Sequence, residues 1–113
     1  MHKLHHFVAM LAVASSVAFA EPALVVDEAA AQMLARQSGC FKCHSIEKKK
    51  TGPPYRAVAA QYRGDPSAAS KLYDHVTTGK SVKFDDGHQE EHRIVQTTDV
   101  DSIRNLIAWI LAL

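Results

Sequence analysis

The feature that most constrains this chain is a pair of cysteines, Cys40 and Cys43, with His44 directly after the second. They are the only 2 cysteines among 113 residues. A disulfide across so short a spacing would stabilise a fold little, because the entropy removed from the unfolded chain grows with the length of the closed loop. The spacing therefore indicates a redox pair or a ligand-binding pair rather than a structural disulfide.

Residues 40–44 read Cys-Phe-Lys-Cys-His, which is the attachment motif of c-type haem. Two thiols at this spacing lie close together on one face and can add to the two vinyl groups on one edge of a porphyrin. We therefore predict one covalent haem c at Cys40 and Cys43, with His44 as the proximal iron ligand. The alternatives are a thioredoxin-like redox pair, which needs a strand–helix context, and a zinc site, which needs two distant histidines as further ligands.

Residues 1–20 predict a secretory signal peptide that is cleaved from the chain. Lys3 precedes an apolar run, and residues 18–20, Ala-Phe-Ala, have the small-x-small pattern of a cleavage site. The apolar run is shorter than the roughly 20 residues of a membrane-spanning helix, so we expect no stable membrane insertion after cleavage. The mature protein is then a single domain of residues 21–113 in the periplasm, small enough to need a stabilising cofactor.

The charge of the chain argues against nucleic acid as a partner. Thirteen basic and 12 acidic residues give a net charge of +1 at pH 7, whereas phosphate binding needs a basic surplus. Lysines nevertheless cluster beside the cysteine motif, at positions 42, 48, 49 and 50. This cluster is either a solvated loop or a docking site for periplasmic redox proteins, which are the partners we expect.

Helical patterns cover most of the chain after the leader, so an all-α domain is predicted. Helices are expected over residues 27–39, 55–62 and 67–77, and the last begins at Thr98 as N-cap and carries an apolar stripe. No segment has a strand period of any weight. Residues 79–96 form a long segment without helical period, and loops of this length in compact domains are usually functional.

Residues 27–113 resemble a class I cytochrome c of the small bacterial kind. The resemblance rests on the first helix ending at Gly39, the motif at 40–44, the loop and helix of 51–59 and a last helix bearing Trp109. It implies four to five helices around one covalently bound haem. It further implies that the Pro53 carbonyl accepts a hydrogen bond from the His44 ring, that Tyr55 and Trp109 line the haem pocket, and that the first and last helices cross near Gly39.

The sequence departs from that family at the second axial ligand, which is usually a methionine in the long segment before the last helix. Beyond the leader the chain has only Met33, which precedes the attachment motif. Counted back from Trp109, the family's methionine position falls at residue 92, which is a histidine here. We therefore predict His44/His92 axial ligation, which would lower the potential relative to relatives with methionine.

Other ligands and functions remain as alternatives. His88 is the competing histidine, and an open site, a water or Lys83 are further possibilities. A closed bis-histidine iron exchanges only electrons, so a periplasmic electron carrier rather than an enzyme is the leading prediction. An open iron would instead indicate a protein that binds or senses NO, CO or oxygen. The third alternative is a haem subunit of a periplasmic sulfur- or nitrogen-oxidising enzyme.

Overall fold

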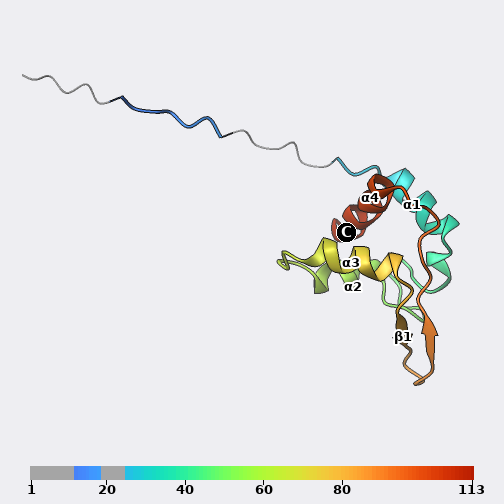
Figure 1. Ribbon diagram of the computed structural model, residues 1–113. Coiled ribbons are helices and arrows are strands. Elements are labelled where there is room, and N and C mark those ends of the chain that lie inside the picture. Colours follow the sequence, from blue (N-terminus) through green and yellow to red (C-terminus); the bar gives the residue numbers. More distant parts are fainter. Residues whose placement is uncertain (1–11, 19–24) are drawn as a thin grey trace, which may run out of the picture.

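The computed structural model describes residues 12–18 and 25–113 (Figure 1). Residues 12–18 are exposed and form neither helix nor strand. Most of the predicted signal peptide, including its cleavage site, therefore lies outside the described residues. Within the described residues, no helix is both long and apolar enough to cross a membrane.

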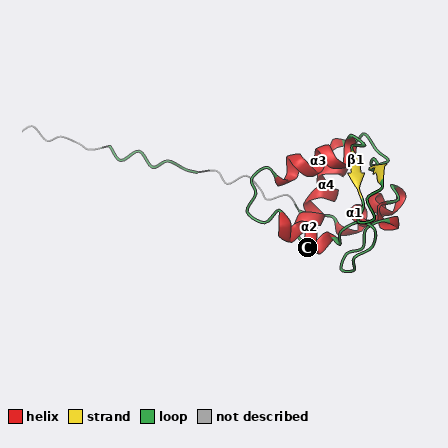
Figure 2. Ribbon diagram, turned by 90° about the horizontal axis from the view of Figure 1, so that it is seen from below, coloured by secondary structure: helices red, strands yellow, loops and turns green. Residues whose placement is uncertain are grey.

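The described part of the chain is built mainly of helices, as predicted. Figure 2 shows these helices packed together, with a small hairpin at one side. In chain order the elements are α1 (Glu28–Gln37), the 3-10 turn η1 (Cys40–Lys42), α2 (Tyr55–Gln61), α3 (Ala68–Thr77), β1 (Ser81–Lys83), β2 (Gln89–Glu91) and α4 (Val100–Leu111). The prediction of an all-α fold is confirmed.

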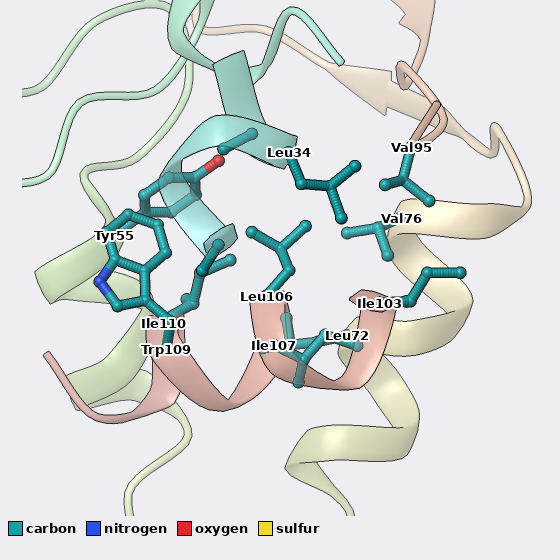
Figure 3. Close-up of a cluster of buried hydrophobic side chains, with 12 residues drawn as sticks. Leu34, Tyr55, Leu72, Val76, Val95, Ile103, Leu106, Ile107, Trp109 and Ile110 are labelled. Carbon is teal, nitrogen blue, oxygen red and sulfur yellow. The ribbon is translucent and has the colours of Figure 1, made fainter. Parts of the chain in front are cut away.

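Helix α4 forms the centre of the core, because α1, α2 and α3 all pack against it. Its buried side chains follow a helical stripe and consist of Ile103, Leu106, Ile107, Trp109 and Ile110 (Figure 3). The helix begins one residue later than predicted: Asp99, not Thr98, is the N-cap, and its carboxylate accepts from the backbone N–H of Ser102 at 3.0 Å. A carboxylate there also complements the positive end of the helix dipole.

Helix α1 lies against α4 through small side chains. Ala31 and Ala35 are fully buried, and Asp27 and Asn105 join the two helices by a reciprocal pair of backbone–side-chain hydrogen bonds of 2.9 and 2.8 Å. The three atoms nearest to a Cβ built on Gly39 belong to Arg93 and not to α4. A Cβ on Gly39 would lie 3.2 Å from the guanidinium of Arg93, and its φ of +74° ends α1 in the left-handed region that favours glycine.

The long segment before α4 contains an antiparallel hairpin that the sequence analysis did not predict. Strands β1 and β2 pair from Ser81–Glu91 to Lys83–Gln89, and Figure 1 shows the hairpin projecting away from the helices. The turn between them contains Gly87 at φ +89°. Both strands are largely exposed and polar, so they lack the alternation of apolar and polar residues by which half-buried strands are recognised.

Candidate haem-binding site

A cavity of about 590 Å³ opens beside the cysteine motif. Its walls come from η1, the loop before α2, helices α2, α3 and α4, and the hairpin with the residues that follow it. Six residues predicted for the site line this cavity: Cys40, Cys43, His44, Pro53, Tyr55 and His92. The volume falls within the range of roughly 300–1,000 Å³ typical of ligand and cofactor pockets.

The proximal wall holds His44 from three sides. Its ring Nδ1 donates to the carbonyl oxygen of Pro53 at 2.7 Å, the hydrogen bond implied by the family resemblance. The Tyr55 ring stacks on it, with centroids 4.9 Å apart and planes inclined by 16°. Gly52 lies so close that an added Cβ would be 2.9 Å from His44 Cε1. Because Nδ1 donates its proton, Nε2 keeps the lone pair that binds a metal.

The two cysteines lie on one turn of backbone beside this histidine. The amides of Cys43 and His44 both donate to the carbonyl oxygen of Cys40, at 3.2 and 2.9 Å. Both thiols are free and half-buried. Burial raises the pKa of the Cys40 thiol, whereas reactive redox cysteines have a lowered pKa. This direction of shift argues against the alternative of a thioredoxin-like redox pair.

The distal wall brings His92 across the cavity from His44. The ring of His92 is half-buried, and its pKa is lowered to about 4, first by burial and then by the nearby His75 and His44. A neutral ring with an available lone pair is the form that binds a metal. Its Nδ1 is buried, and no hydrogen-bond partner for it is found among the described residues.

The separation of the two histidine rings tests whether an iron fits between them. Their centroids are 6.2 Å apart, with planes inclined by 58°. An imidazole nitrogen binds a metal at about 2 Å and lies about 1 Å from its ring centroid, so two imidazoles on opposite sides of one metal have centroids roughly 6 Å apart. The residues present therefore fit a haem iron with His44 and His92 on its two faces.

His75 is a residue of this site that the sequence analysis did not select. It lies on α3, is half-buried and lines the same cavity. Its ring centroid is 3.8 Å from that of His92. One signal could have found it: His75 stands beside the apolar stripe of α3, three residues after Leu72 and next to Val76, both of which are buried.

The alternative ligand His88 lies outside the cavity. It is on the exposed hairpin, where its ring stacks on Phe84 and its two nitrogens contact the carboxylates of Asp86 and Glu90. The hydrogen bond to Asp86 raises the pKa of His88. A ring held in this way is not available to the iron, so the prediction of His88 as runner-up is not supported. Lys83 lines the cavity but is exposed on β1.

Trp109 is one layer further from the cavity than the resemblance implied. It is 3 % exposed and is not among the cavity-lining residues. Its ring meets Tyr55 edge-on, with centroids 5.7 Å apart and planes inclined by 78° (Figure 3). Trp109 therefore packs against Tyr55, which itself lines the cavity.

Helices around a cavity with a Cys-x-x-Cys-His turn define the class of small c-type haem proteins, and comparisons with known proteins agree. The sequence model of the family Cytochrome c matches residues 28–113. Cytochrome c-551 of Allochromatium vinosum is 38% identical over 81 residues, which cover 72% of this chain and 83% of that protein. The chain belongs to the cytochrome c family.

Solved structures give the same result. The class 1 cytochrome MtoD of Sideroxydans lithotrophicus ES-1 is 48% identical, with a TM-score of 0.75 over 78% of this chain and 97% of that one. Cytochrome c552 of Nitrosomonas europaea is 28% identical, with a TM-score of 0.56 over 71% of this chain and 95% of that one. Together these likenesses support a haem electron carrier with haem c covalently attached through Cys40 and Cys43.

Proposed function

We propose that the protein is a periplasmic one-electron carrier whose haem iron is bound by His44 on the proximal side and His92 on the distal side. The observation that carries this proposal is the pair of imidazole rings facing the same cavity with centroids 6.2 Å apart. Bound there, the haem supplies an iron that alternates between the ferric and ferrous states.

The side chains around the cavity suit that task. Pro53 orients the His44 ring and increases its basicity through the hydrogen bond to Nδ1. Apolar residues on the helical side of the cavity, Leu72, Val76, Leu106 and Ile110, are all buried and exclude water from that side. Exclusion of water is one of the means by which a protein tunes the potential of a haem.

The distal histidine also favours electron transfer over the other predicted functions. A haem that binds NO, CO or oxygen needs an open position on its iron, and so does one that performs catalysis. Ligation by His92 would fill that position. Two histidine ligands leave the iron free to exchange electrons but not to bind a substrate.

The pattern of residues 1–20 supports the proposed location, and the surface charge beside the attachment motif supports the proposed partners. The leader pattern of residues 1–20 supports export to the periplasm. Beside the attachment motif, Lys49 pairs with Asp85 at 2.7 Å and Lys50 donates to the carbonyl oxygen of Phe41. Lys42 and Lys48 are also exposed there, and we propose that they steer a redox protein with an acidic surface to this side.

Replacing His92 with methionine tests the ligation. His92→Met should raise the reduction potential and change the ferric and ferrous visible spectra, because a thioether stabilises the ferrous state relative to imidazole. His88→Met is the matched control, since His88 lies outside the cavity, and it should leave both unchanged. An unaltered potential and spectrum in His92→Met would show that His92 does not bind the iron.

A further inference from the structure

We propose that His75 is the positioning residue that holds the His92 ring on the iron. The inference rests on the proposed ligation by His92 and goes beyond it, because it concerns what keeps that ligand in place. The ring of His75 packs directly on the ring of His92, with centroids 3.8 Å apart and planes tilted by 42°.

A comparison of the two axial rings shows why His92 needs such a contact. His44 has the Pro53 carbonyl as hydrogen-bond acceptor and the face of Tyr55 as a stacking partner. For His92, Nδ1 is buried and has no hydrogen-bond partner in the part of the chain that the structure describes. The ring contact with His75 therefore supports His92 on the distal side, as the stacking contact with Tyr55 supports His44 on the proximal side.

The backbone around His75 makes it a rigid support. On α3 it lies between Leu72 and Val76, whose buried side chains fix this helix to the core. The carbonyl of Val76 accepts from the amide of Val95 at 2.9 Å, and the carbonyl of Lys80 accepts from the amide of His92 at 3.0 Å. Two backbone hydrogen bonds thus join the end of α3 and the turn after it to the distal segment, residues 92–95.

Gly79 completes this junction between α3 and the distal segment. Its φ is +64°, and a Cβ built on it would lie 3.6 Å from the carbonyl oxygen of His92. The chain can therefore turn at Gly79 and return close beside α3. This geometry positions the backbone of His92, and the contact with the His75 ring positions its side chain.

The expected change in CO binding follows from the interaction free energy of one aromatic pair. Losing one such pair should increase the population of protein with His92 detached from the iron by about two- to tenfold. Carbon monoxide binds the ferrous iron only when His92 is detached, so the rate of CO binding reports that population directly. The ferric EPR g-values report the orientation of the ring.

The experiment compares the purified haem-loaded protein with His75→Ala, His75→Phe and the control His88→Ala. We expect His75→Ala to bind CO about two- to tenfold faster and to shift the ferric g-values. His75→Phe should restore the wild-type behaviour, because a phenyl ring preserves the packing. His88→Ala should behave as wild type, since His88 lies on the exposed hairpin outside the cavity.

Three results would overturn the inference. The first is that His75→Ala has the CO-binding rate and the g-values of the wild type. The second is that His75→Phe binds CO as fast as His75→Ala does. The third is a low-spin spectrum in His92→Ala that is lost only when His75 is also replaced. His75 would then be an iron ligand itself. An unchanged spectrum in His92→Ala that persists in the double variant would instead refute the proposed ligation by His92.

Discussion

The proximal and distal walls of the cavity hold their histidines in different ways. On the proximal side, the hydrogen bond, the stacking contact and the close glycine of the His44 ring all come from residues 52–55, a few positions along the chain. On the distal side, the ring contact of His92 with His75 and its backbone hydrogen bond to Lys80 come from the end of α3 and the turn after it. The proximal ring has a hydrogen bond, whereas the buried Nδ1 of the distal ring has no partner in the described residues.

This difference indicates separate tasks for the two walls. A ligand held by a hydrogen bond, a stacked ring and a close glycine has one orientation, as the attachment turn requires. A ligand ring whose Nδ1 has no hydrogen-bond partner among the described residues is more easily displaced. We therefore expect the proximal wall to control attachment and folding, and the distal wall to control the potential and access to the iron.

The largest effect is expected from removing the attachment thiols. The double variant Cys40→Ala/Cys43→Ala should carry no covalent haem and should lose most of its helical structure, because the haem fills the cavity around which the helices pack. Haem staining of a denaturing gel and far-UV circular dichroism measure the two losses. A haem stain that survives in the double variant would contradict the attachment site.

A second, intermediate effect is expected at Gly52 on the proximal wall. Gly52→Ala places a methyl group 2.9 Å from the His44 ring and should reduce the free energy of unfolding by about 1–3 kcal/mol. Because the ring must shift, the ferric spectrum should change as well. Denaturant unfolding monitored by circular dichroism, with visible spectra of the same samples, checks both.

Gly64→Ala is the matched control for Gly52→Ala. Gly64 has φ +80° but no atom within 4 Å of an added Cβ, so its replacement strains the backbone without touching the site. A loss of about 1–2 kcal/mol is expected from the left-handed conformation, with an unchanged spectrum. If the two variants have the same spectrum, Gly52 does not position His44.

The smallest effect is expected at an ion pair between the loop after the attachment motif and the hairpin. Lys49, in the loop after the attachment motif, contacts Asp85 at the tip of the hairpin, and both side chains are largely exposed. Exposed ion pairs contribute little, so Asp85→Asn should leave the unfolding midpoint and the CO-binding rate unchanged. A faster CO-binding rate in Asp85→Asn would show that the two walls are coupled through this contact.

The proximal side was largely predictable from the sequence, because its geometry is local. The attachment motif, the following loop and the start of α2 are contiguous, and residues 40–55 bring His44, Pro53 and Tyr55 together. The first three helices were also predicted within a few residues, since each has an apolar stripe with a recognisable beginning or end. Motifs and apolar stripes of this kind depend only on residues close together in the sequence, so they can be recognised without a structure.

The distal side was predictable only in part, because tertiary contacts decide it. His92 was found by its distance from Trp109, a spacing taken from the family resemblance. His75 was not selected, since its place beside the apolar stripe of α3 is only a weak signal until α3 is placed against residues 92–95. The polar hairpin lacks the alternation of apolar and polar residues that predicts a strand. Thr98 and Asp99 are both favourable N-cap residues, so only the structure shows that Asp99 is the N-cap of α4.

The most direct test of the bis-histidine electron carrier is the visible and EPR spectrum of the purified wild-type protein, ferric and ferrous, before and after CO. The proposed ligation by His44 and His92 predicts a low-spin ferric spectrum of bis-histidine type and a ferrous spectrum that CO alters only slowly. A high-spin ferric spectrum, or a ferrous spectrum that shifts as soon as CO is added, would contradict it and indicate an open distal position.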